Sequence, residues 1–390
     1  MSHVKTIASL LLLSGITSAL GSELAPVIPR YRVTQMVLAS ADQQGMTYLA
    51  FPSLLRTSPD EALIAIKRGY RHGGDTEAVG EMLRLDTARN VVTARQVVAQ
   101  SSGLIYQMGE WVRFPNGDIA VYFDVQTLGH DGRNYRAGMR ENRSSDGGRT
   151  FEGIKQSPPV DGREYGYPFD FIVQGNTTYM LVMAFGYRPG GRWSVDVIKS
   201  EDNGRSWSFV RNLTEEFGGH RINESAFLPW DNGFLVTTRA YGVSQRLYRT
   251  DAQFRKLAEI DLSAAHPFME SHIGRPRLFT RDGGIYLLGR NWRTAEPGGE
   301  RRELAGTGRL VGGPGWMELA LFRIDPATLR IARWVILDNA ERAKVTDGYY
   351  AVPYFQDRAE RTWLDVITYR GVDGAHPDIV RLEFDWDEVR

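Results

Sequence analysis

The sequence predicts an all-β protein of six similar units, the arrangement of a six-bladed β-propeller with four antiparallel strands in each blade. Three observations lead to this prediction. An eight-residue pattern, S-x-D-x-G-x-[ST]-aromatic, occurs twice, at 144–151 and 200–207. Six strand-like segments that end in an aspartate follow one another along the chain at the spacing of propeller blades. The chain also has 41 Gly beside 17 Phe, 17 Tyr and 9 Trp, a composition typical of many short strands joined by tight turns.

Each copy of the eight-residue pattern suits a tight turn between two strands. The carboxylate of Asp146 or Asp202 can accept hydrogen bonds from nearby backbone N–H groups, and the glycine two positions later tolerates a positive φ angle. The closing aromatic residue, Phe151 or Trp207, can pack under the turn. By itself the pattern therefore predicts fold rather than activity.

The six units can be followed along the chain by their aspartate endings, at Asp86, Asp146, Asp202, Asp251, Asp325 and Asp385. Asx-Gly turns at 116–117, 232–233 and 282–283 join apolar runs within units and predict hairpins. The sixth unit ends at Asp385, too close to the C-terminal Arg390 for a fourth strand of its own. A lone strand predicted at 31–40 can supply that strand and close the ring, which removes the open sheet edges.

The N-terminal residues predict export. His3 and Lys5 precede the apolar run 7–13, and small residues at 19–21 offer a cleavage site. We therefore expect residues 1–21 to be a signal peptide and residues 22–390 to be a single propeller domain. The apolar run is too short to span a bilayer, and there is no cysteine to acylate or to form a disulfide. The sequence predicts a secreted or periplasmic protein that does not insert into the membrane.

Charge and motif content argue against several function classes. Lys plus Arg equals Asp plus Glu, 47 of each, so no overall field favours nucleic acid. No H-E-x-x-H or H-x-H cluster is present, the glycine-rich run at 311–315 lacks the lysine of a phosphate loop, and no serine lies in a G-x-S-x-G setting. The sequence thus predicts no metal, no cofactor and no nucleic-acid partner.

The repeated turn resembles the Asp box of sialidases and related propellers, and the resemblance extends over nearly the whole mature chain. In the first unit, the segment 51–55 (FPSLL) is similar to the sialidase R-I-P-S-L opening, but Ala50 replaces the arginine that belongs to the family's carboxylate-binding triad. Asp75 follows at about the spacing of the family's general acid/base, on a glycine-rich loop. A solvated aspartate that caps its own loop is the alternative.

Three polar residues lie close to Asp75 in the sequence. Arg68 and Arg71 are candidates for substrate binding, and His72 follows directly. A surface charge cluster without function is the alternative interpretation of this group.

The fourth unit carries the best local match. Glu224 opens a strand and Arg239 ends its hairpin partner, so the tight turn between the two strands brings these residues side by side. The resemblance implies that Glu224 activates the nucleophile and that Arg239 is a triad arginine; an ordinary cross-strand ion pair is the alternative. The fifth unit repeats the layout and offers Arg290 as a further substrate-binding residue, whereas the stretch around Trp316 lacks the family's third arginine.

The sixth unit opens with D-G-Y-Y-A-V at 347–352, similar to the G-Y-S-x-L motif that carries the sialidase nucleophile. Tyr349 takes the tyrosine position, and Tyr350 is expected to face the other way because side chains alternate along a strand. Aromatic core packing is the alternative for Tyr349.

Taken together, the resemblance implies an exported exo-glycosidase that removes terminal, acidic sugars from glycans, with Tyr349 as nucleophile, Glu224 as its base and Asp75 as acid/base. A neutral tyrosine suits such a substrate, since the carboxylate on its anomeric carbon repels an approaching anion. Two other hypotheses stay open. One is a related enzyme on another glycan, either a neutral-sugar hydrolase or a uronate lyase that uses His72 or His272. The other is a glycan-binding propeller without catalysis.

Overall fold

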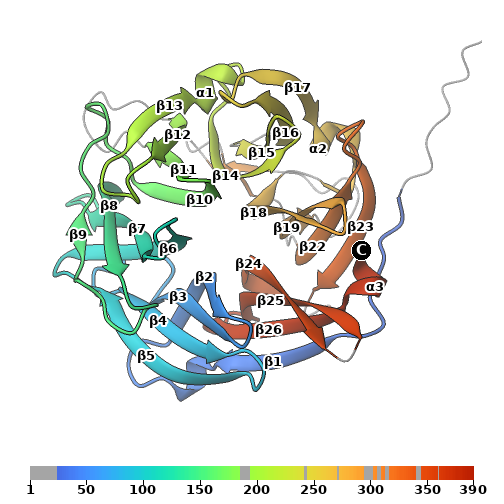
Figure 1. The fold of residues 1–390 in the computed structure, drawn as a ribbon. Helices are drawn as coiled ribbons and strands as arrows, with labels where there is room; N and C mark the ends of the chain where they lie inside the picture. Colours follow the sequence, from blue (N-terminus) through green and yellow to red (C-terminus); the bar gives the residue numbers. More distant parts are fainter. Residues whose placement is uncertain are drawn as a thin grey trace, which may run out of the picture.

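The protein is a closed ring of six sheets, each with four antiparallel strands (Figure 1). This computed structural model describes, of the chain, residues 24–184, 194–240, 244–269, 272–293, 302–304, 309–311, 316–339, 344–358 and 360–390. The six-bladed, all-β fold predicted from the sequence is confirmed. The signal peptide predicted at 1–21 lies outside the described residues.

The first three blades follow one another in sequence, each running outward from its first strand. They comprise β2 (Tyr48–Ser58), β3 (Glu61–Gly69), β4 (Val79–Asp86) and β5 (Val91–Ala99); β6 (Leu104–Arg113), β7 (Ile119–Leu128), β8 (Asn134–Ser144) and β9 (Lys155–Gln156); and β10 (Tyr167–Gln174), β11 (Thr177–Ala184), β12 (Ser194–Ser200) and β13 (Ser208–Asn212).

The other three blades have the same layout, and the last one borrows its outer strand from the N-terminal end. They comprise β14 (Ile222–Trp230), β15 (Gly233–Ala240), β16 (Gln245–Asp251) and β17 (Lys256–Asp261); β18 (Ile273–Arg281), β19 (Gly284–Arg293), β22 (Trp316–Ile324) and β23 (Ile331–Asp338); and β24 (Val345–Arg358), β25 (Arg361–Val372), β26 (Asp378–Asp385) and β1 (Val33–Leu38).

Short elements lie outside the six sheets. The 3₁₀ turn η1 (Ser40–Asp42) and the short helices α1 (Leu213–Glu216) and α2 (Leu262–Ala265) join successive blades. A small hairpin of β20 (Arg302–Leu304) and β21 (Arg309–Val311) lies between β19 and β22 of the fifth blade, and the helix α3 (Trp386–Val389) follows β26.

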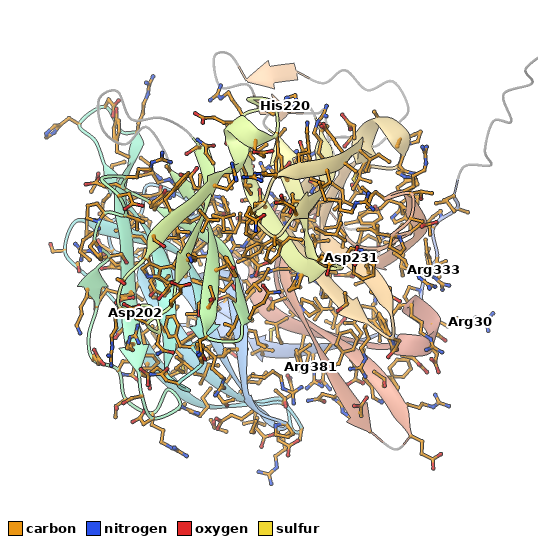
Figure 2. All side chains as sticks on the ribbon, turned by 45° about the horizontal axis from the view of Figure 1, so that its top comes forward. Arg30, Asp202, His220, Asp231, Arg333 and Arg381 are labelled. Atoms are coloured by element: carbon orange, nitrogen blue, oxygen red, sulfur yellow. The ribbon has the colours of Figure 1, made fainter. Side chains whose placement is uncertain are left out.

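The ring closes where β1 pairs antiparallel with β26, as the lone strand near the N-terminus predicts. A buried arginine strengthens this junction. Arg381 on β26 (labelled in Figure 2) donates from Nε to Asp365 of the neighbouring strand at 2.6 Å and from NH1 to the carbonyl of Thr87 in the first blade at 2.6 Å. The guanidinium therefore ties the last blade to the first.

The two copies of the eight-residue pattern form the same turn, between the third and fourth strands of blades two and three. Oδ1 of Asp146 accepts from the backbone N of Thr150 at 2.9 Å, and Oδ1 of Asp202 (Figure 2) accepts from the backbone N of Ser206 at the same distance. Both hydroxyls at these positions also donate to the aspartate, at 2.6 Å. The turns lie at strand ends away from the ring centre and have a structural role.

The inner strand of every blade changes register against its neighbour. The shifts fall between Ala50 and Ser53, Tyr106 and Met108, Pro168 and Asp170, Ile222 and Ser225, Gly274 and Arg277, and Gly348 and Ala351. Bulges of this kind bend a strand, re-aim its side chains and are common beside functional sites. Three bulky residues within them, Phe51, Arg275 and Tyr349, have positive φ angles of 57°, 47° and 66°. Such conformations are uncommon for bulky residues, and the surrounding sheets impose them here.

Candidate functional site

A cavity of about 540 Å³ lies at the centre of the ring, and all six blades contribute to it. Its lining is unusually rich in ionisable and aromatic side chains. It consists of Phe51, His72, Gln107, Met108, Asp124, Gln126, Arg136, Tyr167, Asn223, Glu224, Arg239, Arg290, Trp292, Met317, Thr346, Asp347 and Tyr350.

Glu224, on β14, is the most heavily hydrogen-bonded group of this lining. Its Oε1 accepts from the hydroxyls of Tyr350 at 2.6 Å and Tyr167 at 2.8 Å. Its Oε2 accepts from NH1 of Arg239 at 2.5 Å and from the backbone N of Arg275 at 2.9 Å. All four partners donate, which is the arrangement that an ionised carboxylate requires when it is buried.

The electrostatic surroundings of Glu224 and Tyr350 keep the Glu224 carboxylate charged and the Tyr350 phenol neutral. Burial alone would raise the pKa of Glu224, but the charge of Arg239 and the hydrogen bond from Tyr350 hold that pKa well below its ordinary value. Burial, together with the adjacent Glu224 charge, raises the pKa of Tyr350, and Arg290 and Arg239 oppose that rise only in part. The site therefore presents a protonated phenol directly beside a carboxylate that can take its proton.

Three arginines from three blades enter the cavity. Arg239 on β15 also approaches the Tyr350 hydroxyl, at 3.5 Å. Arg290 on β19 donates to the same hydroxyl at 3.3 Å and to the carbonyl of Gly348 at 3.3 Å, with its guanidinium carbon 4.5 Å from the centre of the Tyr350 ring. Arg136 on β8 forms an ion pair with Asp124. Within the described part of the chain Arg290 forms no ion pair, so its charge is open to an anionic ligand.

A second carboxylate, Asp347 on β24, lines the cavity together with a histidine. Its Oδ2 accepts from the Tyr48 hydroxyl and contacts Nδ1 of His72 at 2.7 Å, and its Oδ1 accepts from the Tyr369 hydroxyl at 2.9 Å. Burial opposes ionisation of Asp347, but His72 and Tyr48 outweigh it and lower its pKa to about 2.

Behind Glu224 lies a buried layer of charge that fixes its position. Arg275 and Arg277 on β18 both pair with Glu110 on β6, the second at 2.7 Å. The bulge that holds Arg275 at positive φ also turns its backbone N–H toward Glu224. Gly274 also packs tightly against Arg290, because a Cβ on Gly274 would lie 2.8 Å from Nε of Arg290. This close contact helps to hold the Arg290 side chain in place.

The structure places Glu224, Arg239 and Arg290 in the cavity, as expected, but it places three other candidates elsewhere. Asp75 is buried and folds back on its own loop, where Oδ2 accepts from the backbone N of Tyr70 at 2.6 Å. Arg68 bonds Glu81 at 2.6 Å, and Arg71 bonds the carbonyl of Gly74 at 2.7 Å. None of the three lines the cavity. Asp75 caps its own loop, as the alternative interpretation proposed, but it is buried and not solvated.

The tyrosine assignment requires a correction by one position. Tyr349 points between blades five and six, where its hydroxyl donates to Asp338 at 2.9 Å within an apolar cluster. Tyr350 carries the hydroxyl that meets Glu224. The cause is the β-bulge between Gly348 and Ala351, with Tyr349 at positive φ, which interrupts the regular alternation of side chains.

Sequence reasoning missed four lining residues, for different reasons. Asp347 lies directly before the Gly-Tyr-Tyr segment, so its place was available from the motif. His72 was named as a neighbour of Asp75 and as a candidate base of a uronate lyase, but not as a lining residue paired with Asp347. Arg136 and Asp124 belong to the second blade and carry no local signal, although Arg136 supplies a guanidinium where Ala50 leaves none.

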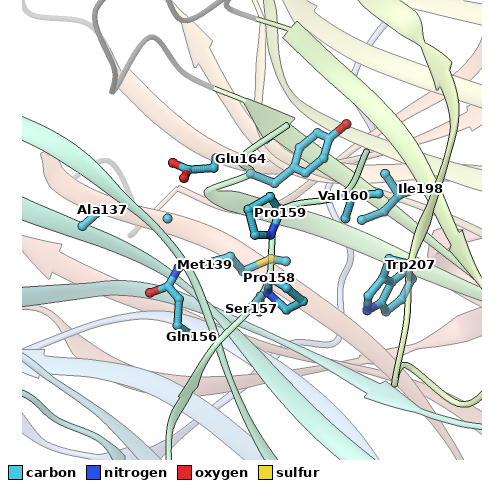
Figure 3. A pocket seen from close by; sticks show the side chains of 12 residues that line it. Ala137, Met139, Gln156, Ser157, Pro158, Pro159, Val160, Glu164, Ile198 and Trp207 are labelled. Atoms are coloured by element: carbon cyan, nitrogen blue, oxygen red, sulfur yellow. The ribbon is translucent and has the colours of Figure 1, made fainter. Parts of the chain in front are cut away.

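The rest of the described residues shows no sign of a metal site or a membrane-spanning helix. They contain no group of three His, Cys, Asp or Glu side chains that could hold a metal ion, and none of their helices could cross a membrane. A second hollow of about 260 Å³ lies between blades two and three, lined mainly by Pro158, Pro159, Val160 and Trp207, with Glu164 as its one carboxylate (Figure 3). It lacks the paired ionisable groups of the central cavity.

Comparison with known proteins supports the fold. No family model and no curated protein sequence matches this chain. A protein of unknown function from Dyadobacter fermentans superposes with a TM-score of 0.66 at 14% identity, over 92% of this chain and 99% of its own. The NanB sialidase of Streptococcus pneumoniae gives 0.59 at 9% identity, over 91% and 71%. Trypanosoma rangeli sialidase in complex with sialic acid gives 0.59 at 12% identity, over 92% and 59%. The chain thus has a sialidase-like propeller fold.

Proposed function

We propose that the protein is an exported exo-glycosidase that releases a terminal acidic sugar, with Tyr350 as nucleophile and Glu224 as its base. The observation that carries the proposal is the 2.6 Å hydrogen bond between the Tyr350 hydroxyl and Glu224, inside a cavity that also holds Arg239 and Arg290. Tyrosine is the nucleophile of sialidases, which depart from the usual two-carboxylate scheme of glycosidases. Export rests on the signal peptide predicted at 1–21.

The pair suits a substrate with a carboxylate on its anomeric carbon. A protonated phenol approaches such a carbon without charge repulsion, and Glu224 takes its proton as the new C–O bond forms. Arg239 and Arg290 both approach the Tyr350 hydroxyl, so a substrate carboxylate bound between them lies next to the atom that attacks.

Substrate binding also prepares Glu224 for its task. In the structure Arg239 holds the pKa of Glu224 low, which makes the carboxylate a weak base. A substrate carboxylate that shares Arg239 weakens this hold, because one guanidinium then serves two anions. The basicity of Glu224 therefore rises only when an acidic substrate is present, and the substrate's own charge contributes to catalysis.

The test is covalent trapping by 2,3-difluorosialic acid, a compound that occurs as a covalent intermediate in a solved structure of Trypanosoma rangeli sialidase. We expect intact mass spectrometry to show one adduct on the wild-type protein, located at Tyr350 by peptide mapping. Tyr350→Phe should form none. Tyr349→Phe is the matched control, since it removes the neighbouring hydroxyl outside the cavity, and it should react like the wild type.

Two results would overturn the proposal. A folded wild-type protein that forms no adduct and releases no product from a fluorogenic sialoside is not a sialidase-type hydrolase. Release of a product with a conjugated double bond from a uronic-acid polymer would instead identify a uronate lyase, for which His72, held by Asp347, offers a base and the Tyr350 hydroxyl offers an acid.

A further inference from the structure

The proposed hydrolase still needs a group that protonates the leaving oxygen, and the cavity shows which carboxylates are unsuited to this. Asp75 is buried in its own loop and does not line the cavity. Glu224 serves Tyr350. Asp124 is fully buried and is paired with Arg136 and Gln126. Asp347 accepts from Tyr48 and Tyr369 and contacts His72, and with a pKa of about 2 it carries no proton at neutral pH.

His72 has the geometry that these carboxylates lack. Its Nδ1 contacts Asp347 at 2.7 Å and the Tyr48 hydroxyl at 2.9 Å, so one ring nitrogen is anchored. Its Nε2 makes no hydrogen bond within the described residues, and the side chain is 60% exposed at the cavity. An anchored Nδ1 with a free Nε2 is the arrangement in which an imidazole exchanges protons with a ligand.

The backbone of His72 is also held in place. Its carbonyl accepts from Nζ of Lys67 at 2.7 Å and from Nε2 of Gln107 at 2.8 Å, which fixes the loop against blades one and two. Phe51 packs edge-on against the His72 ring at 5.1 Å and lies 5.7 Å from the Tyr350 ring. The nucleophile and the imidazole thus border one common space, and the imidazole occupies its solvent-facing side, where the leaving part of a glycan must lie.

We propose that His72, oriented by Asp347, is the general acid and then the general base of the reaction, in place of an aspartate. The inference rests on the proposed function and adds a catalytic residue to it. Asp347 is a positioning residue, since it acts through the imidazole.

The steps balance. The bond between the anomeric carbon and the leaving oxygen breaks while the bond to the Tyr350 oxygen forms. Nε2 of His72 gives its proton to the leaving oxygen, and Glu224 takes the proton of the phenol. Water then attacks the anomeric carbon while the bond from that carbon to the Tyr350 oxygen breaks, His72 takes one proton from the water, and Glu224 returns its proton to the Tyr350 oxygen. Asp347 stays ionised throughout and keeps the proton of the imidazole on Nδ1 after the first transfer.

The experiment compares leaving groups in the full mature chain. His72→Ala is assayed on an aryl sialoside, whose leaving phenolate needs little protonation, and on a sialyl-lactose, whose leaving alkoxide needs it strongly. We expect kcat/KM for sialyl-lactose to fall by about 10²–10⁴-fold, and kcat/KM for the aryl sialoside to fall less than about tenfold. His130→Ala is the matched control, because His130 is exposed and outside the cavity lining, and it should leave both substrates unchanged.

Trapping separates this inference from the function on which it rests. Fluoride leaves 2,3-difluorosialic acid without strong acid assistance, so His72→Ala should still form the Tyr350 adduct and should lose it slowly, because no base activates water. Wild-type protein that forms no adduct overturns both proposals. Wild-type protein that forms the adduct, with His72→Ala cleaving sialyl-lactose normally, overturns the role of His72 alone. Asp124→Asn and Asp75→Asn are assayed in parallel. If either variant loses more activity on sialyl-lactose than on the aryl sialoside while His72→Ala does not, the role of His72 is also overturned.

Discussion

Arg239 keeps the buried Glu224 ionised, and replacement of Arg239 by methionine tests this effect without any substrate. Methionine preserves most of the side-chain volume and removes the charge. Glu224 is then a buried carboxylate whose remaining partners, two tyrosine hydroxyls and one backbone N–H, are all neutral donors. Its burial, at 4% exposed surface, favours the neutral acid once the guanidinium is gone.

The size of the effect follows from the geometry. Loss of one partner of a buried ion pair costs about 3–5 kcal/mol of folding free energy. At about 1.4 kcal/mol per pKa unit, this corresponds to an upward displacement of the Glu224 pKa by about 2–4 units. The sign is fixed by linkage. In the wild type the folded-state pKa of Glu224 is depressed, so its contribution to stability is present above pH of about 4.5 and is lost only as pH falls through the folded-state pKa.

In Arg239→Met the folded protein keeps the Glu224 proton to a higher pH than the wild type does. The loss of stability relative to the wild type therefore grows with pH, by about 1.4 kcal/mol per pH unit, until Glu224 ionises in the variant. Urea unfolding followed by tryptophan fluorescence between about pH 2 and pH 6 measures this directly, because a depressed Glu224 pKa that is displaced upward by about 2–4 units lies in that range. Arg239→Lys keeps the charge and should show little slope, and the double variant Arg239→Met with Glu224→Gln should show none. Parallel stability curves for Arg239→Met and the wild type would refute the reasoning.

Two further predictions concern the packing of the site and the closure of the ring. Gly274→Ala places a Cβ 2.8 Å from Nε of Arg290, so Arg290 must move. We expect kcat/KM for an acidic substrate to fall by about tenfold, measured by steady-state kinetics, while the midpoint of thermal unfolding stays unchanged. Arg381→Ala removes the nearer of the two cations of the buried Asp365 and leaves only Arg358, at 3.5 Å, so it should lower the unfolding free energy by about 3–5 kcal/mol. Arg361→Ala, which breaks an exposed pair, should cost less than about 1 kcal/mol in the same urea titration.

Local pattern was enough to predict the features that depend on one hairpin or one turn. The two eight-residue turns and the aspartate-ended strands indicated the number of blades, because each is recognised within a few neighbouring positions. Glu224 and Arg239 were found for the same reason, since the tight turn between their strands forces the two strand ends together. The closing strand β1 followed from counting, as the last unit lacked one strand.

The residues that sequence reasoning misplaced depend on geometry that no local pattern encodes. The resemblance to the nucleophile motif assigned Tyr349 to the cavity and strict alternation turned Tyr350 away from it, but the bulge in β24 places Tyr350 there. Spacing alone assigned Asp75, but its carboxylate satisfies N–H groups of its own loop, and the neighbouring His72 reaches the cavity instead. Arg136 arrives from a different blade from the one that lacks the expected arginine, and only the closed ring brings it there.

The charges of the cavity point to the class of ligand that completes it. Its lining holds three carboxylates and three guanidiniums, and two of the ion pairs, Arg136 with Asp124 and Arg239 with Glu224, are internally balanced. Asp347 balances His72 when the imidazole carries the proton that the leaving oxygen requires. Arg290, which forms no ion pair within the described residues, then remains beside the Tyr350 hydroxyl, where its charge also acts on Glu224 and Asp347. In the proposed reaction, a substrate with one carboxylate at the anomeric carbon pairs with Arg290, whereas a neutral sugar of the same shape leaves that buried cation without an ion pair. Discrimination between the acidic and the neutral sugar therefore comes from the cost of leaving Arg290 unpaired as much as from the attraction between Arg290 and the substrate carboxylate.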